Sequence, residues 1–266
     1  MGRAIEDRGI RCAGWWEPHL RCTREFLERG VPASKKVAVF GAGRLLDLNL
    51  KRLLERCEVV HLFDADPGCM RAWRAAAGKE FGKRVVPRIV DLTECLDEWS
   101  HGLARSARVG TLAEYLTSRE APIPSWSGEG FEGVISLNML GQIPLYWRDR
   151  VLTGKSELSD VEAEALMRCM GRLQAAHAEG IAQLQPTWAA IITDTEYYFY
   201  DVDQPEWRVE SAVFDEKTRD MLRLRPESRT PRSESWLWHV APQFIESDVE
   251  GEIHRVEARF LTSFKR

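Results

Sequence analysis

Short apolar runs recur along most of the chain. They cover residues 37–40, 59–63, 133–137 and 188–193, and a further strand candidate, with two arginines among its apolar residues, lies at 84–90. Each run is too short for a helix and has the length and composition of a strand that is buried on both faces. The stretches between the runs carry apolar residues at helical spacing, as in 159–183. Strands that alternate with helices predict an α/β fold with a mostly parallel sheet.

The last part of the chain has a different pattern. Residues 234–240 and 254–264 alternate apolar and polar positions, which is typical of antiparallel strands. A helix is expected at 211–223. The sequence therefore predicts an antiparallel strand pair at the C-terminal end of the domain.

A helix is also predicted before the first strand. It covers Trp16–Arg29, with Pro18 in its first turn and Gly30 just past its end, where proline and glycine are favoured. We therefore expect two parts: a helical extension at 1–34, which could cover a pocket, and an α/β domain at 35–266.

The segment after the first strand carries the clearest chemical signal. Gly41-Ala42-Gly43 follows the strand directly, and glycines there let the backbone turn sharply and lie against a ligand. Leucines from Leu45 to Leu54 then predict a helix, and Asp64 ends the second strand. An acid at that position suits the two hydroxyls of a ribose. The segment predicts a site for an adenosine-containing ligand.

The glycines alone leave three interpretations open: a dinucleotide site, a site for another adenosine-containing ligand, and a turn with a purely structural role. A dinucleotide site of the GxGxxG type needs glycine at position 46, where this chain has Leu46, and no GxxxxGK[ST] phosphate loop occurs. A nicotinamide cofactor is therefore less favoured than another adenosine ligand. The third interpretation is a structural glycine turn that binds nothing.

Composition excludes several classes of protein. The net charge of −4 over 266 residues argues against a general nucleic-acid binder. No apolar run approaches the ~20 residues of a membrane span, and the charged N-terminus has no signal-peptide core. The six cysteines lack CxxC spacing, so we expect reduced thiols, no metal site and a cytoplasmic location.

The order of these elements resembles the class I S-adenosylmethionine-dependent methyltransferases from about Lys35 to the end. VAVFGAGRLLDL is similar to their first motif, with Leu45 in place of the usual third glycine; HLFDAD is similar to the second, and GVISLNMLGQIP to the fourth strand and its loop. The resemblance implies a Rossmann-like three-layer sandwich. Its sheet would be mostly parallel and seven-stranded, with an antiparallel C-terminal pair and a preceding helix.

The resemblance also implies which residues bind the cofactor, S-adenosylmethionine. Asp64 would hold the ribose and Asp91 would face the adenine amine, with Thr93 beside it, while Asn138 would meet the methionine part. The full set of expected cofactor residues is Gly41, Ala42, Gly43, Asp64, Ala65, Asp91, Leu92 and Asn138.

The acceptor side is less defined. Asp194 and Tyr197 follow the fifth strand, and His239 is the most base-like histidine; these are the candidate catalytic residues. Further candidates lie at the ends of the fourth and fifth strands and in the N-terminal helix, where aromatic side chains could cover the pocket. They are Gln142, Tyr146, Trp147, Glu196, Tyr198, Trp15, Trp16 and His19.

The resulting hypothesis is a methyltransferase that acts on a small molecule or a protein, with a homodimer as one arrangement and no nucleic-acid or membrane partner. Two alternatives stay open. One is a binding protein with the methyltransferase fold and no turnover. The other is an NAD(P)-dependent oxidoreductase, against which Leu46 and the preceding helix argue.

Overall fold

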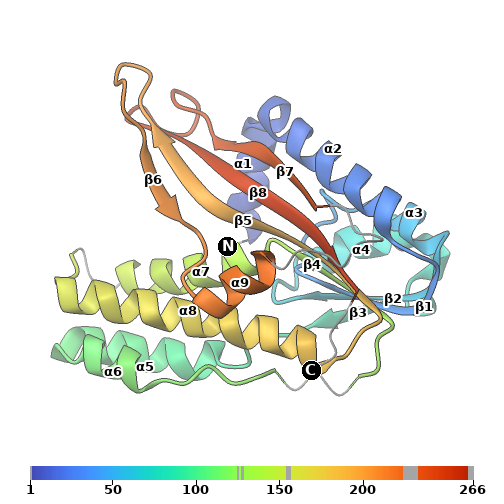
Figure 1. The fold of residues 1–266 in the computed structure, drawn as a ribbon, viewed down its shortest axis with the longest axis horizontal. Coiled ribbons are helices and arrows are strands. Elements are labelled where there is room, and N and C mark those ends of the chain that lie inside the picture. The colour runs from blue at the N-terminus through green and yellow to red at the C-terminus, as the bar shows by residue number, and fades with distance from the viewer. Residues whose placement is uncertain (1, 125, 127–128, 154–156, 224–232, 263–266) are drawn as a thin grey trace.

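The computed structural model describes residues 2–124, 126, 129–153, 157–223 and 233–262. In these residues one eight-stranded sheet carries helices on both faces (Figure 1). The strands are β1 (Ser34–Phe40), β2 (Cys57–Asp64), β3 (Val85–Ile89), β4 (Gly133–Leu137), β5 (Trp188–Tyr200), β6 (Arg208–Ser211), β7 (Ser233–Ala241) and β8 (Gly251–Leu261). The helices are α1 (Gly2–Arg11), α2 (Ala13–Gly30), α3 (Leu50–Leu54), α4 (Cys69–Ala77), α5 (Leu96–Val109), α6 (Leu112–Ser118), α7 (Met139–Thr153), α8 (Asp160–Gln183) and α9 (Glu216–Arg223), with a 3-10 turn at Gly78–Glu80.

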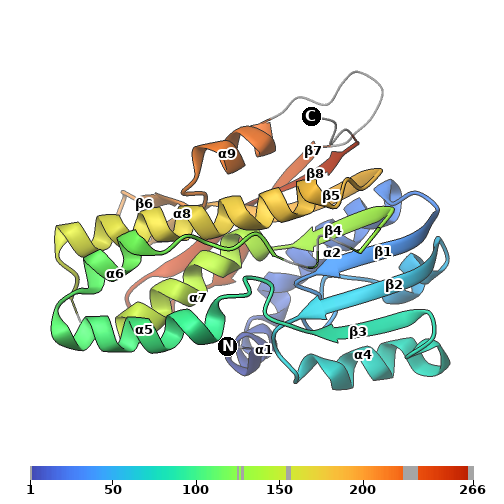
Figure 2. The ribbon, with the colours of Figure 1, turned by 90° about the horizontal axis from the view of Figure 1, so that it is seen from below.

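The parallel part of the sheet follows the prediction. The strand order is β3-β2-β1-β4-β5-β8-β7, and the strands from β3 to β5 run parallel (Figure 2). Since the carboxyl ends of parallel strands meet at one edge, the segments after β1, β2, β3 and β4 gather there. The Rossmann-like α/β fold class is confirmed.

The C-terminal pair is antiparallel, as predicted. β8 pairs with β5 and β7 pairs with β8, both antiparallel. Of the strand expected at 254–264, residues 263–264 lie outside the described part of the chain. The expected helix at 211–223 is shorter, because Arg208–Ser211 forms β6 before α9 begins.

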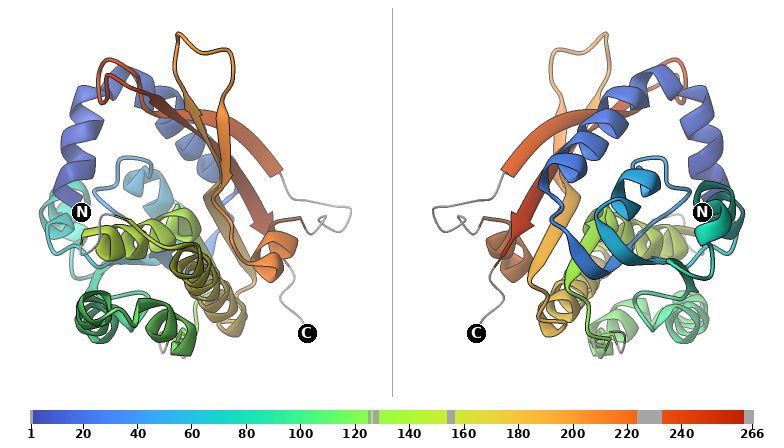
Figure 3. Two further views of the ribbon diagram at one scale, coloured as in Figure 1. Left: turned by 90° about the vertical axis from the view of Figure 1, so that its left-hand side faces the viewer. Right: turned by 90° about the vertical axis from the view of Figure 1, so that its right-hand side faces the viewer.

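Seven strands form the main path of the sheet, as expected, and an eighth strand, β6, pairs with β5 beside that path because β5 is longer than its apolar run. β5 continues from the buried core through Thr195 to Tyr200, and its second half pairs with β6. The β5–β6 hairpin extends beyond the neighbouring strands (Figure 3). The sequence beyond Asp194 is mixed in polarity, so it gave no apolar run that would mark an extended strand.

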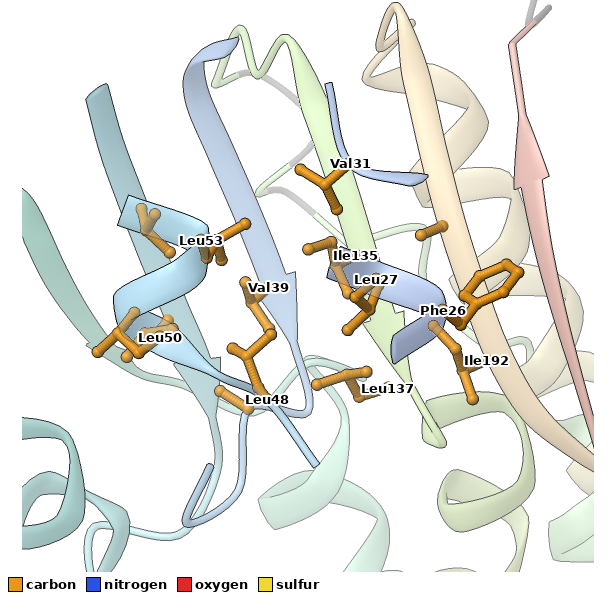
Figure 4. Close-up of a cluster of buried hydrophobic side chains, with 14 of the residues drawn as sticks. Phe26, Leu27, Val31, Val39, Leu48, Leu50, Leu53, Ile135, Leu137 and Ile192 are labelled. Atoms are coloured by element: carbon orange, nitrogen blue, oxygen red, sulfur yellow. The ribbon is translucent and has the colours of Figure 1, made fainter. Parts of the chain in front are cut away.

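The two faces of the sheet bury alternate residues of each strand. Val37 and Val39 of β1 pack on the face covered by α2, α3 and α4, whereas Ala38 and Phe40 point to the face covered by α8. Figure 4 shows the first of these clusters, in which Leu27 of α2 approaches the β-sheet beside Ile135 and Leu137. This alternation fixes the register of the parallel strands.

The long helix α8 begins as the sequence indicates. The Ser159 side chain accepts a hydrogen bond from the backbone N–H of Glu162, and the Glu162 carboxylate accepts one from the Ser159 N–H. This capping box satisfies two of the backbone donors that a helix start leaves unpaired.

The predicted helix directly after the glycine turn was wrong. Only Leu50–Leu54 forms a helix there, and residues 41–49 form successive turns. Leu45 adopts a φ of +62°, a left-handed conformation that an α-helix does not contain. The leucines have helical spacing in the sequence although only part of the segment is a helix, because Leu48 packs into the core from a turn and Leu50 and Leu53 from the short α3.

The N-terminal helix α2 is fixed to the sheet by close packing. Phe26 stacks on Phe260 of β8 at 4.8 Å between ring centroids, and the α-carbon of Gly30 lies so close to Phe260 that an added Cβ would come within 1.9 Å of the ring. Within the described residues, no helix combines the length and apolar character that crossing a bilayer requires. The division at residue 34 stays a prediction.

We predict that Gly30→Ala destabilises the protein by ~1–3 kcal/mol, the usual cost of overpacking. Gly14→Ala is the matched control in the same helix, because its Cβ would meet nothing within 4 Å. That control should leave stability unchanged or raise it by about 1 kcal/mol. Urea unfolding of both variants measures the difference, and equal stabilities would contradict the packing of α2 on β8.

Candidate functional site

The glycine turn after β1 is held by the end of β2. The backbone N–H groups of Gly41 and Ala42 both donate to the Phe63 carbonyl at 3.0 Å. Gly41 and Gly43 have φ values of +71° and +48°, which glycine adopts without strain. A Cβ at Gly41 would lie 2.6 Å from the Leu137 carbonyl oxygen. The turn therefore needs glycine for both conformation and space.

Asp64 ties this turn to the loop after β2. Its carboxylate accepts the Gly43 N–H at 2.8 Å and the Asp66 N–H at 2.9 Å. Burial raises the pKa of Asp64, while these backbone hydrogen bonds act in the opposite direction. The indole N–H of Trp73 donates to the Gly43 carbonyl at 2.7 Å, so the turn is held from two sides.

A cavity of about 750 Å³ opens above this turn, which is within the range of small-molecule and cofactor sites. Its wall brings together most of the expected cofactor residues and several expected acceptor-side residues. They are Gly41, Gly43, Asp64, Ala65, Asp91, Leu92, Asn138, Thr93, Gln142, Tyr146, Trp147, Trp16 and His19. Ala42 is absent from the wall because its side chain is buried in the core.

Asp91 follows β3 and Asn138 follows β4, at the carboxyl edge of the parallel sheet. One oxygen of Asp91 accepts the backbone N–H and the hydroxyl of Thr93 at 2.8 and 2.7 Å. Asn138 has a φ of +54°, and its Oδ1 is buried without a hydrogen-bond partner among the described residues. Buried polar atoms of this kind are rare, so Asn138 offers an acceptor for a ligand.

An aromatic wall completes the cavity from outside the parallel sheet. It consists of Trp16 and His19 of α2 and Trp238 of β7, which all line the cavity. The His19 ring stacks on Trp238 at 4.1 Å, and Trp16 meets Trp238 edge-on at 5.0 Å. His19 accepts the indole N–H of Trp236 through Nδ1, and burial lowers its pKa to about 4. His19 is therefore neutral at pH 7, with its proton on Nε2.

The charges around the cavity are mainly negative. Of the described residues that line it, four are aspartates and one is an arginine, Arg44. Sequence reasoning missed two of these acids, Asp47 and Asp66. Asp47 lies in the turn segment that was expected to be helical, where a single polar residue gave no signal. An anionic wall favours cationic ligands over anionic ones.

Comparisons with known proteins found distant likenesses in structure. No protein family defined by sequence matches the chain, and no curated protein matches it. An rRNA methylase from Streptococcus thermophilus is 12% identical, with 87% of this chain and 91% of that chain covered and a TM-score of 0.34. A putative RNA methyltransferase from Pyrococcus horikoshii is 12% identical (86% and 75% covered, TM-score 0.37). A putative methyltransferase from Streptococcus mutans in complex with S-adenosylhomocysteine is 10% identical (90% and 97% covered, TM-score 0.36).

The topology of the sheet assigns the fold more directly. Five parallel strands in the order 3-2-1-4-5 are followed by an antiparallel strand, β8, inserted between β5 and β7. This is the sheet topology that the resemblance to the class I methyltransferases implies, so the expected fold is confirmed. Membership of that family and the roles expected of individual residues stay predictions.

The two candidate bases expected at the end of the fifth strand, Asp194 and Tyr197, lie within β5 and outside the cavity wall. Asp194 is fully buried, and its Oδ2 lies 3.1 Å from His254 Nδ1. Burial opposes a charge on His254, but the carboxylates of Asp194 and Glu252 raise its pKa to about 9. Tyr197 is buried, with its hydroxyl 3.4 Å from the Gly141 carbonyl. Asp194 of β5 and Glu252 and His254 of β8 form an internal ion cluster, and the Tyr197 ring packs against His254.

His239 also lies away from the cavity wall. Its Nε2 is 2.5 Å from the Tyr200 hydroxyl, and its ring meets Trp15 edge-on at 4.7 Å. Trp15 is 47% exposed, while its neighbour Trp16 is buried in the cavity wall. Adjacent helical residues point in different directions, so only one tryptophan of the pair can face the cavity.

We predict that Asp47→Asn stabilises the unliganded protein at pH 8 by ~1–3 kcal/mol. Burial raises the pKa of Asp47 from 3.8 to about 6, so the folded state holds this proton more tightly than the unfolded chain does. The ionised carboxylate therefore costs stability above pH 6, and the cost fades as the pH falls towards 4.

Chemical unfolding at pH 8 and pH 4 measures this effect. The stabilisation by Asp47→Asn should be present at pH 8 and absent at pH 4. An equal gain at both pH values would show that it does not come from the charge.

Proposed function

We propose that the protein is an S-adenosylmethionine-dependent methyltransferase. The observation that carries the proposal is the cavity itself, in which the glycine turn, Asp64 and Asp91 surround a space with an anionic wall. Asp64 would accept hydrogen bonds from the ribose hydroxyls, and the segment Asp91–Leu92 would flank the adenine. The positively charged sulfonium suits a wall that carries more carboxylates than cations.

The same wall argues against a dinucleotide. NAD carries an anionic pyrophosphate, which α/β proteins usually hold at a helix N-terminus directly after the glycine turn. Here the next helix begins only at Leu50, and Asp47 stands between the turn and that helix in the cavity wall. The pyrophosphate would lack its dipole and would meet a carboxylate.

Methyl transfer makes modest demands on this chain. A bond forms between the acceptor atom and the methyl carbon while the sulfur–methyl bond breaks, and its electron pair stays on sulfur as a thioether. Alignment of donor and acceptor can supply about 7–11 kcal/mol of the barrier. The aromatic wall of Trp16, His19 and Trp238, together with Tyr146 and Gln142, would exclude water and shape the acceptor's place.

A binding protein without turnover is the second candidate. Asp194, Tyr197 and His239 lie outside the cavity wall. The bases expected from the sequence would therefore not reach an acceptor bound in the cavity, which favours this candidate. Such a protein would bind the cofactor equally well. Transfer of a labelled methyl group to a panel of small-molecule and protein acceptors separates the two candidates.

The first prediction for this function concerns Asp64. Wild-type protein should bind S-adenosylhomocysteine, and Asp64→Ala should weaken the affinity roughly 10- to 100-fold, because hydrogen bonds to a charged group are lost. Asp203→Ala, the same change in the exposed turn after β5, should have no effect. Titration calorimetry measures all three, and thermal melting confirms that each variant is folded. Failure of the wild type to bind S-adenosylmethionine or S-adenosylhomocysteine at millimolar concentration would refute the proposed function.

The second prediction concerns ligand charge. S-adenosylmethionine should bind more tightly than S-adenosylhomocysteine at low salt, and added NaCl should reduce the difference, because salt screens the sulfonium from the carboxylates. NADH should not bind, as fluorescence titration can show. Tighter binding of NADH than of S-adenosylhomocysteine would favour the oxidoreductase alternative.

A further inference from the structure

Five aromatic rings form a continuous strip on the antiparallel part of the sheet, outside the cavity wall. The Trp15 ring of α2 meets the His239 ring of β7 at 4.7 Å between centroids, and His239 meets Tyr200 of β5 at 5.4 Å. Trp207, which precedes β6, lies 5.6 Å from Tyr200 and 6.4 Å from Tyr198. This aromatic strip therefore joins three segments that are far apart in the sequence.

The aromatic strip is open to solvent. Trp15 is 47% exposed and Trp207 is 52% exposed, whereas the other eight tryptophans, all of them in the described part of the chain, are buried or half-buried. Single exposed apolar side chains are ordinary, but a contiguous exposed patch marks an interaction surface. The two exposed tryptophans belong to the same strip, so they mark one surface.

The surroundings of the aromatic strip are acidic. Residues 196–210 and 242–252, in the outer part of the β5–β6 hairpin and the connection from β7 into β8, hold nine acids and one arginine, and the structure describes all of these residues. The arginine, Arg208, is already paired with Glu210 and Glu250. Four of the acids have no cationic side chain of the described residues within ion-pair distance: Asp201, Asp203, Glu206 and Asp248. This surface therefore attracts a cationic partner and repels phosphates.

An aromatic surface with an acidic border is suited to arginine. The guanidinium is planar and weakly hydrated, so it stacks on aromatic faces while its charge pairs with carboxylates. The hairpin already contains one such contact, because the guanidinium of Arg208 lies 4.0 Å from the centroid of the Phe199 ring. Burial lowers the pKa of His239, so this ring of the strip is neutral at pH 7 and does not repel a cation.

We propose that the aromatic strip is the docking surface for an arginine-rich segment of a partner protein. The centroid distances from Trp15 to Trp207 limit the span to about five residues of extended chain, because such a chain rises ~3.3 Å per residue. The inference does not rest on the proposed function, since none of the five residues of the strip lines the cavity.

The experiment measures the binding of three fluorescein-labelled peptides by fluorescence anisotropy. The peptides are about seven residues long, and in them glycine alternates with arginine, lysine or glutamate. The proteins are wild type, Trp207→Ala, Trp207→Phe, Trp15→Ala and Glu206→Gln. Met167→Ala is the matched control for apolar surface, because Met167 is 48% exposed on α8, and Glu58→Gln is the control for an exposed acid at the start of β2.

We expect wild type to bind the arginine peptide about fivefold more tightly than the lysine peptide and not to bind the glutamate peptide. Trp207→Ala and Trp15→Ala should each weaken the arginine peptide about fivefold, whereas Trp207→Phe, which keeps a ring, should lose about twofold. Glu206→Gln should weaken both cationic peptides about twofold, because one exposed carboxylate is lost. The two control variants should bind as the wild type does.

Quenching of tryptophan fluorescence by acrylamide gives a second readout that needs no variant. Trp15 and Trp207 are the exposed tryptophans of the chain, so acrylamide reaches them first. The arginine peptide should protect the wild type from quenching, and the glutamate peptide should not. Thermal melting checks that each variant is folded, and Trp207→Ala should bind S-adenosylhomocysteine as the wild type does.

Three results would overturn the inference. The wild type could fail to bind the arginine peptide at millimolar concentration. It could bind the arginine and lysine peptides equally, with no loss in Trp207→Ala or Trp15→Ala, which would indicate attraction by charge alone. It could also bind a single-stranded oligonucleotide more tightly than the arginine peptide, which would make the strip a stacking surface for bases. Failure of the wild type to bind S-adenosylhomocysteine is a different outcome, because it would refute the proposed function alone.

Discussion

The site depends on the hydrogen bonds between the end of β2 and the glycine turn after β1. Phe63 and Asp64 together accept the N–H groups of residues 41–43 and of Asp66. These bonds hold the turn at the sheet edge, and the indole N–H of Trp73 donates a further hydrogen bond to the Gly43 carbonyl. The parallel sheet places the ends of β3 and β4 at the same edge as this turn, so the other polar residues of the cavity wall lie around it.

The cavity combines two kinds of wall with different origins. The parallel sheet supplies its polar floor, whereas α2 and β7 supply aromatic side chains from the two ends of the chain. His19 and Trp236 are joined by a hydrogen bond across 217 positions of sequence. The packing of Phe26 and Gly30 on Phe260 keeps α2 at the sheet, so the helical extension is a structural part of the site.

Local patterns predicted the parts of the fold that local physics determines. The buried strands, the glycine turn and the position of Asp64 could be predicted from short stretches of sequence, and the start of α8 from Ser159 and Glu162 alone. The sequence could not show that Leu45 takes a left-handed conformation, that β5 continues past Asp194, or that Asp47 enters the cavity. Each of these depends on contacts made elsewhere: the short α3, the pairing of β5 with β6 and β8, and the closeness of α2. Asp194 and Tyr197 looked like strand-end residues, but the longer strand buries them beside His254.

The central claim is that this cavity holds an adenosyl cofactor against Asp64. A crystal structure of the protein soaked with S-adenosylhomocysteine tests it most directly. We expect the ribose hydroxyls within hydrogen-bond distance of the Asp64 carboxylate, the adenine beside Asp91 and Leu92, and the amino-acid part between Asn138 and the aromatic wall. An empty cavity at saturating ligand, or density for the ligand at another place on the molecule, would contradict the claim.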